Sequence, residues 1–144
     1  MKTRLVRELI HSKGLFVAPP TINVVEAARR MQDGNVGALM IVDAGRLLGI
    51  FTERDALFRV TAQSLDPKLT KIETVMTQAP ITVSPDDTFG RALRLMLENG
   101  FRHVPVTIDG TPVGMVSARD ALACEVAVIE AEQQVKESIA EILA

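Results

Sequence analysis

The order of hydrophobic and polar positions occurs twice along the chain. Each copy opens with a short apolar run that is closely followed by a proline, over Leu15–Ala18 and again over Pro80–Val83. In the stretches that come next, Asn23–Asp33 and Asp87–Glu98, apolar residues recur at i, i+3, i+4 and i+7. This spacing places them on one face of an amphipathic helix.

Two runs rich in β-branched and aliphatic residues follow each predicted helix. In the second copy they are joined by Asp109-Gly110, a pair typical of a two-residue hairpin turn. A further helix is expected to begin after Thr52 and after Ser117. The predicted strands are Ala38–Val42 and Leu47–Phe51 in the first copy, and Val104–Ile108 and Pro112–Val116 in the second.

The two copies keep one register without a gap. The run Gly49–Leu57 reads Gly-Ile-Phe-Thr-Glu-Arg-Asp-Ala-Leu, and 65 residues later Gly114–Leu122 reads Gly-Met-Val-Ser-Ala-Arg-Asp-Ala-Leu. Self-similarity over such a length indicates a duplicated structural unit. The same offset aligns Pro20 with Pro85, Ala27 with Ala92, Met31 with Met96 and Gly45 with Gly110.

The sequence therefore predicts an α+β fold built from two strand–helix–strand–strand–helix repeats. One repeat is too small to bury both faces of its sheet, so the two should pack on each other with pseudo-two-fold symmetry. Helices are expected to flank this pair at both ends of the chain. The predicted boundaries are 1–14 for an N-terminal helical segment, 15–62 and 80–126 for the two repeats, 63–79 for their connection and 127–144 for a C-terminal helix.

The two flanking helices allow two interpretations. The predicted N-terminal helix, Thr3–His11, is short, whereas the predicted helix Cys124–Leu143 is longer and carries Val128, Val135 and Ile142 at intervals of seven. Both helices could pack on the core of their own chain, or they could join two subunits. The spacing alone leaves both possibilities open.

Composition narrows the function classes. The chain has 144 residues, a net charge of −2 and only 3% aromatic residues, which argues against nucleic-acid binding and against an anionic membrane surface. No apolar run is long enough to cross a membrane and no secretion signal is visible, so a cytoplasmic location is expected. Hydrophobic residues make up 47%, a surplus that favours a homodimer interface.

The repeated run Gly-x-x-Thr/Ser-x-Arg-Asp is the main candidate site. It lies where a strand ends and a helix begins, so free backbone N–H groups and the helix dipole can receive a phosphate. The hydroxyls of Thr52 and Ser117 can add a hydrogen bond to that anion. Asp55 and Asp120, one turn into each helix, can accept hydrogen bonds from the two hydroxyls of a ribose.

The same residues also match a structural motif. Thr-x-x-Asp and Ser-x-x-Asp fit a helix N-cap with a reciprocal acidic partner. However, Arg54 and Arg119 occupy the first helical turn, where a cation opposes the helix dipole at a cost of about 0.3–1 kcal/mol. A cation placed there twice suggests a bound anion.

A further basic pair occurs only in the second copy. Arg102-His103 stands where the first copy has Gly37-Ala38. If both copies bind anions, the second is therefore expected to bind the more highly charged one, or to bind more tightly. Alternatively, the pair forms a solvated corner before a strand, since a lone histidine indicates little by itself.

Taken together, these residues resemble the paired cystathionine-β-synthase (CBS) domain family over nearly the whole chain. The hallmarks are Val75-Met-Thr, Pro80-Ile-Thr-Val-Ser-Pro85, Arg102-His-Val-Pro-Val106 and both Gly-x-x-Thr/Ser-x-x-Asp runs. The first copy departs from the family pattern. It reads Leu15-Phe-Val-Ala-Pro-Pro20 where Val-Thr-Val-x-Pro is frequent, and it lacks the His-x-Pro-Val element.

The resemblance implies clefts between two CBS domains that bind AMP, ADP, ATP, NAD or S-adenosylmethionine, and pairs that dimerise as a flat disc. It assigns Asp55 and Asp120 to ribose. It assigns phosphate to Thr52, Arg54, Ser117 and Arg119, with help from Arg102 or His103. It places adenine beside the backbone amides of Val17, Leu39, Thr82 and Val104.

The predicted function is a regulatory module that senses an adenosine nucleotide and signals its occupancy to a separate protein. The alternative is a ligand-free CBS module that acts through homodimerisation, which is favoured if Arg54 and Arg119 are paired with internal carboxylates. An enzyme is not expected. Beyond carboxylates and hydroxyls, only Cys124, His11 and His103 offer nucleophile or base chemistry, too few for a metal-ligand cluster, so neither a metal nor a catalytic cofactor is expected.

Overall fold

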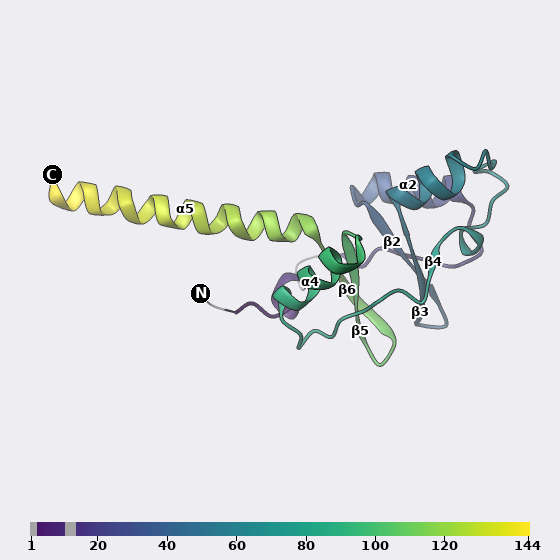
Figure 1. Cartoon of the computed structure of the whole chain (residues 1–144), viewed down its shortest axis with the longest axis horizontal. Coiled ribbons are helices and arrows are strands. Elements are labelled where there is room, and N and C mark those ends of the chain that lie inside the picture. The colour runs from purple at the N-terminus through teal and green to yellow at the C-terminus, as the bar shows by residue number, and fades with distance from the viewer. Residues whose placement is uncertain (1–2, 11–13) are drawn as a thin grey trace.

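The computed structural model describes residues 3–10 and 14–144, arranged as two α/β halves and one long projecting helix (Figure 1). The helices are α1 (Arg7–Ile10), α2 (Val24–Gly34), α3 (Glu53–Asp55), α4 (Phe89–Asn99) and α5 (Ala118–Leu143), with a π-helical segment at Ala56–Thr61 and a 3₁₀ turn at Ile72–Thr74. The strands are β1 (Val17–Ala18), β2 (Ala38–Asp43), β3 (Arg46–Thr52), β4 (Thr77–Gln78), β5 (His103–Ile108) and β6 (Thr111–Ser117).

Both predicted amphipathic helices are present and their ends follow the repeat. Asn23 Oδ1 accepts the Glu26 N–H at 2.8 Å to begin α2, and 65 residues later Thr88 Oγ1 accepts the Arg91 N–H at 3.1 Å to begin α4. Such side-chain caps satisfy N–H groups that have no partner within the helix. Each helix ends at a left-handed residue, Asn35 or Gly100.

The sheets carry the predicted strand order. In the first half the order is β1-β2-β3-β4, with β1 parallel to β2 and the other pairs antiparallel. In the second half β5 and β6 form an antiparallel hairpin. The apolar run Pro80–Val83 contributes only one parallel bridge, between Val83 and Val106, which corresponds to the pairing of Ala18 with Ile41.

Each half has its own aliphatic core. Phe51, Leu39 and Ile41 lie at the centre of the first core, and Val104, Val106 and Val116 at the centre of the second, all almost fully buried. These residues occupy the inward-facing positions of the two hairpins. The apolar faces of α2 and α4 pack against them and complete the two cores. The predicted α+β pair of repeats is therefore confirmed.

The segment that precedes each repeat packs on the other repeat. Val6 and Ile10 lie in the second core, whereas Ile72 and Met76 lie in the first. The backbone contacts repeat as well, since the Val6 N–H donates to Asp87 O and the Ile72 N–H donates to Ile22 O, both at 2.9 Å. The two halves are thus interlocked by a reciprocal exchange of their leading segments.

Because of this exchange, the N-terminal segment and the connection between the repeats are structured, although the sequence pattern places both outside the repeats. The predicted helix Thr3–His11 is reduced to α1 in the described residues, because Leu5 forms a bridge with Thr88 instead; His11 lies outside the described residues. Within the predicted connection 63–79, β4 pairs with β3. The domain boundaries themselves stay a prediction.

At the other end, α5 runs without interruption from Ala118 to Leu143. It merges the helix expected after Ser117 with the predicted C-terminal helix, because no glycine or proline occurs after Gly114. Only its first turns lie against the second half, where Ala121 and Cys124 contact the core. Within the described ranges, no helix is both long and apolar enough to cross a membrane.

Candidate nucleotide site

A cavity of about 630 Å³ opens between the two halves and is named here the site cavity. Its walls come from four parts of the chain: Gly37 before β2, the end of β3 with the helix that follows it, the segment around β4, and the loop that leads into β5. The volume lies within the range of small-molecule sites, about 300–1,000 Å³. The residues that carry charge or polarity there are Thr52, Glu53, Arg54, Asp55, Arg59, Thr77, Asn99, Arg102 and His103.

Asp55 is the buried acid of this cavity, with an exposure of 7%. Its Oδ2 accepts the Thr52 N–H at 3.0 Å, and the Asp55 N–H donates to Thr52 Oγ1 at 3.2 Å. The helix-capping arrangement considered for this motif is therefore present. The other oxygen, Oδ1, faces Arg59 Nε at 3.4 Å, so one edge of the carboxylate is held by a half-exposed cation, which also donates from Nη1 to Met76 O at 2.9 Å.

Arg54 has no acidic partner among the residues that the structure describes. Its Nη1 donates to the carbonyl oxygen of Gly100 at 2.8 Å, at the C-terminus of α4. The negative end of that helix dipole stabilises the guanidinium. The contact also connects the first half to the second at the mouth of the site cavity.

Arg102 and His103 line the same cavity as Thr52 and Asp55. The expectation that the second copy binds the more highly charged anion, or binds more tightly, stays a prediction; in the structure this basic pair lines a cavity with the motif of the first copy. Because the repeats face each other across the pseudo-two-fold axis, the start of one repeat's second strand lies opposite the helix start of the other. Sequence distance within one copy could not show this crossing.

His103 is held in its neutral form. Burial lowers the pKa of His103 from its ordinary value of 6.5; the carboxylates of Glu53 and Asp120 act against this, and the cations Arg102 and Arg119 reinforce it. An anion bound nearby would raise this pKa again, because it favours the protonated imidazole.

Gly37 lies beside a side chain from each half. A Cβ atom at this position would be 3.1 Å from Glu53 Oε1 and 3.3 Å from His103 Nε2. The glycine therefore leaves room for both side chains. Glu53 and Gly37 also line a second cavity of about 340 Å³, so they stand between the two hollows.

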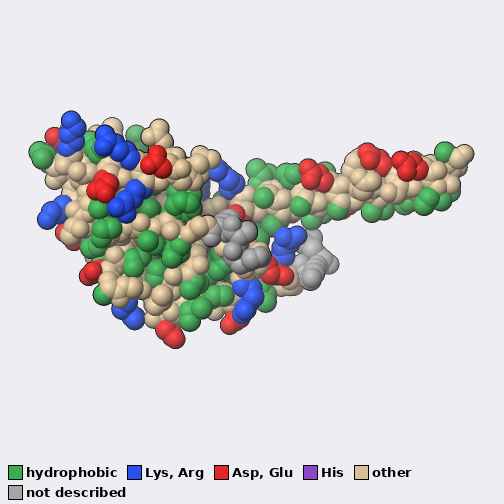
Figure 2. Space-filling model, turned by 180° about the vertical axis from the view of Figure 1, so that it is seen from behind, with side chains coloured by type: hydrophobic (Ala, Val, Ile, Leu, Met, Phe, Trp, Pro, Cys, Tyr) green, Lys and Arg blue, Asp and Glu red, His purple; other side chains and the backbone are tan. Residues whose placement is uncertain are grey.

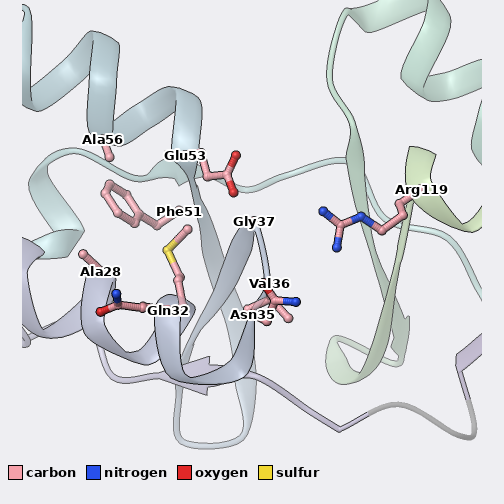
Figure 3. Close-up of a pocket in the computed structure, with 10 residues that line it drawn as sticks. Ala28, Gln32, Asn35, Val36, Gly37, Phe51, Glu53, Ala56 and Arg119 are labelled. Carbon is pink, nitrogen blue, oxygen red and sulfur yellow. The ribbon is translucent and has the colours of Figure 1, made fainter.

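Figure 3 shows this second cavity from the side. Phe51 and Ala28 form its apolar floor, and Glu53 and Arg119 extend toward it from the two halves. The Arg119 guanidinium makes no hydrogen bond or ion pair with the residues that the structure describes. Its counterpart Arg54 has a carbonyl partner, so the two repeated arginines differ.

In the second Ser-x-x-Asp motif the carboxylate accepts from the N-cap residue, as it does in the first. The Ser117 N–H donates to Asp120 Oδ2 at 2.7 Å, and the Ser117 hydroxyl lies 3.4 Å from the same oxygen. The counterparts of the β4 segment for this motif fall at residues 11–15. Part of that stretch lies outside the described residues, so a complete second site is not described.

The four positions proposed for adenine do not line the two cavities described here. Leu39 and Val104 are core residues, Val17 pairs with Met40 in the sheet, and Thr82 is exposed. Only backbone contacts from these residues could reach a base, and their role stays a prediction. The site cavity presents the side chains of Ile50, Thr77, Pro80 and Ile81 instead.

Sequence reasoning missed these apolar and hydroxyl residues, and it also missed Arg59. Thr77 belongs to the predicted connection 63–79, which periodicity does not distinguish from a linker, and Pro80 and Ile81 belong to the apolar run that opens the second repeat. The Val75-Met-Thr hallmark was the available signal, since it marks this stretch as part of the motif. Arg59 follows Asp55 by four residues, the spacing of a helical ion pair.

The arrangement can hold a ligand with an apolar, flat part and an anionic part. Apolar side chains line the β4 side of the cavity, and cations lie on the side of the helix start and the β5 loop. The N–H groups of Thr52, Glu53 and Asp55 at the helix start already have acceptors within the protein. Arg102 and a protonated His103 would face the anionic part of such a ligand. No nucleophile with an adjacent base is brought together among the described lining residues.

A protein-family model described as "CBS domain" matches the chain twice, over residues 6–62 and 72–126. The "CBS domain-containing protein CBSX3, mitochondrial" of Arabidopsis thaliana is 41% identical over 104 residues, which is 69% of this chain and 50% of that protein. The chain spans between about a quarter and two thirds of the length of the first curated relatives that it matches.

Solved structures agree with the family match. The crystal structure of the CBS domain protein NE2398 superposes with a TM-score of 0.81 at 27% identity, covering 87% of this chain and 99% of that chain. The CBS domain pair of protein MJ0100, in complex with 5′-methylthioadenosine and S-adenosyl-L-methionine, superposes with a TM-score of 0.79 at 30% identity, covering 88% and 98%.

Proposed function

Because the chain belongs to the CBS domain family, whose paired members are regulatory modules, we propose that it senses an adenosine-type nucleotide in the site cavity. Occupancy would be passed to a separate protein by a change in how the two halves pack. The observation that supports this most is the crossing of the two halves. It brings the Thr52–Asp55 helix start and the Arg102–His103 pair to one cavity of about 630 Å³.

The chemical features of the cavity support a phosphate-bearing adenosine compound. Asp55 would hold the ribose, and Arg59, which now faces Asp55 Oδ1, would move toward the phosphate side. Arg102 and His103 would receive the phosphate with the Thr52 hydroxyl and Arg54. The MJ0100 domain pair binds adenosyl ligands, so S-adenosylmethionine belongs in the same panel as AMP, ADP, ATP and NAD.

Thermal denaturation with each of these five compounds tests the proposal. A ligand at a hundred times its dissociation constant adds about 2.7 kcal/mol to stability. For a chain of this size each kcal/mol corresponds to about 2–4 °C, so the melting temperature should rise by about 5–10 °C. A panel in which no compound shifts the melting temperature would contradict nucleotide sensing.

Isothermal titration of Arg102→Ala tests the site itself. Loss of a charge-assisted hydrogen bond, worth about 1.5–3 kcal/mol, should weaken the best phosphate-bearing ligand at least about tenfold while leaving adenosine unaffected. Arg94→Ala removes the same charge from the exposed face of α4 and serves as the matched control. Equal effects of the two variants on nucleotide affinity would argue against a phosphate contact at Arg102.

The second candidate function is a ligand-free module that acts through homodimerisation. The capping geometry favours it, because Thr52 and Asp55 already satisfy one another without a ligand. The contact of Arg54 argues against this candidate function, because its partner is a backbone carbonyl oxygen and not an acid. A homodimer, a cytoplasmic location and the absence of catalysis remain part of this proposal, as does an unidentified protein target.

A further inference from the structure

The second cavity, of about 340 Å³, lies apart from the polar residues of both repeated caps. Its walls come from α2, the loop after α2, the end of β3, the helix that follows β3, and Arg119 of the other half. Thr52 and Asp55 do not line it, and neither do Ser117 and Asp120. From its walls we infer that this cavity binds a free α-amino acid with an apolar side chain.

Two opposite charges face each other across this cavity. Figure 3 shows the Glu53 carboxylate and the Arg119 guanidinium pointing toward one another from the two halves. No ion pair joins them, and neither side chain has a hydrogen-bond or ion-pair partner within residues 3–10 and 14–144. An α-amino acid carries an ammonium group and a carboxylate on one carbon atom. Glu53 can therefore bind the ammonium group while Arg119 binds the carboxylate.

The backbone positions both charges. The Glu53 N–H donates to Gly37 O at 3.1 Å. In the other half the Ala118 N–H, next to Arg119, donates to Arg102 O at 2.9 Å. Burial lowers the pKa of the nearby His103, so its imidazole is uncharged at neutral pH and leaves the Glu53 carboxylate for a ligand cation.

A small residue leaves the apolar floor of this cavity open. Ala28 stands where the second repeat has Leu93, which packs against the second core. Together with the buried side chains of Phe51 and Met31, Ala28 forms a floor that suits an aliphatic side chain of a ligand. The volume lies at the lower end of small-molecule sites, about 300–1,000 Å³, and so suits an amino acid better than a nucleotide.

The acid in the wall disfavours a phosphate ligand here. Glu53 does not belong to the duplicated motif, because the second repeat has Ala118 in its place. A carboxylate repels a phosphate group and attracts an ammonium group. The charges of the wall therefore select a zwitterion, and the floor selects one with an apolar side chain.

Isothermal titration of the full chain with leucine, isoleucine and methionine tests the inference. At least one of them should bind with a dissociation constant below about 1 mM, or about −4 kcal/mol. Three analogues of leucine lack one feature each: 4-methylpentanoic acid lacks the ammonium group, 3-methylbutylamine the carboxylate, and glycine the side chain. Each should bind at least about tenfold more weakly. No binding of any of the three amino acids at 10 mM, or equal binding of leucine and 4-methylpentanoic acid, would overturn the inference.

Two variants with matched controls locate the site. Ala28→Leu places the residue of the second repeat on the floor and should weaken the best amino acid at least about tenfold. Ala131→Leu adds the same atoms to α5, whose outer part projects from the body of the protein (Figures 1 and 2), and should change the affinity less than twofold. Glu53→Gln should also weaken binding at least about tenfold, whereas Glu98→Gln, on the exposed side of α4, should not. Equal affinities within either matched pair would contradict binding in this cavity.

Amino-acid binding and nucleotide sensing are tested separately. The titration contains no nucleotide, so a nucleotide panel without effect on the melting temperature contradicts only the proposed function. Ala28 does not line the site cavity, so the nucleotide-induced rise in melting temperature should be the same in A28L and the unaltered chain. Binding of S-adenosylmethionine with no binding of a free amino acid would assign the second cavity to the adenosyl ligand and overturn the inference.

Discussion

Replacing Gly114 by alanine should weaken the packing between α1 and the second half. Gly114 lies on β6 where Ile10 crosses it from the beginning of the chain. A Cβ atom at Gly114 would lie 2.8 Å from Ile10 Cβ and 3.1 Å from both Ile10 Cδ1 and Cγ2. The first of these contacts is to a branched carbon next to the backbone, so rotation of the side chain cannot relieve it.

The expected cost follows from this overlap. Overpacking a buried site by one methyl group costs about 1–3 kcal/mol. For a chain of this size that corresponds to a fall in melting temperature of about 3–10 °C. Gly90→Ala is the control: its nearest atom would be Thr88 Oγ1 at 4.0 Å, and it lies in α4, where alanine is about 0.4–1 kcal/mol better than glycine. The two substitutions should change stability in opposite directions.

Urea denaturation of Gly114→Ala, Ile10→Ala and the double variant measures the effect and its cause. Removal of the Ile10 side chain beyond Cβ takes away two of the three close contacts, so the double variant should be less destabilised than the sum of the single variants by at least about 0.5 kcal/mol. Additive effects would show that Ile10 does not lie against Gly114. The exchange of leading segments would then be wrong.

Three further predictions follow from individual residues. Ala44 has a φ of 50° in the hairpin turn where the second repeat has Asp109, a left-handed conformation that strains alanine more than asparagine. Ala44→Asn should therefore raise stability by about 0.5–1 kcal/mol in thermal denaturation. An unchanged or lower melting temperature would contradict backbone strain at Ala44. Burial lowers the pKa of His103 below 6.5, so on acidification the unfolded chain binds a proton at this side chain before the folded chain does, and stability should fall as the pH drops below about 6.5. His103→Gln should flatten that pH dependence in urea titrations at about pH 5–8. A profile that the substitution leaves unaltered would refute this prediction. Asp120→Ala should abolish nucleotide binding at the second motif while costing only about 0.5–2 kcal/mol from the lost contact with the Ser117 N–H; titration calorimetry that shows unchanged stoichiometry and affinity would contradict the ribose assignment.

Local features of the fold could be predicted because they depend on neighbours in sequence. The apolar spacing of α2 and α4 and the Asp109-Gly110 turn reflect interactions over a few residues. The repeat offset then carried each assignment from one copy to the other. Even the capping role of Thr52 with Asp55 was foreseen as one of two alternatives, and the structure shows that it is present.

The candidate site could be predicted only in part, because it is assembled across the two halves. Thr52, Arg54 and Asp55 were found from a repeated motif, and Arg102 and His103 from their absence in the first copy. Which of these residues share a cavity depends on the packing of one repeat against the other.

By itself, the sequence determined the duplicated unit, its secondary structure and the identity of the charged residues, since periodicity and turn chemistry are local properties. Only the tertiary structure decided that Ile10 packs in the second core and Ile72 in the first, and that Arg102 and His103 line the same cavity as Asp55. The physical reason is that each half buries its apolar surface against whichever segment lies nearest in space. In a pair related by a two-fold axis, that segment belongs to the other copy.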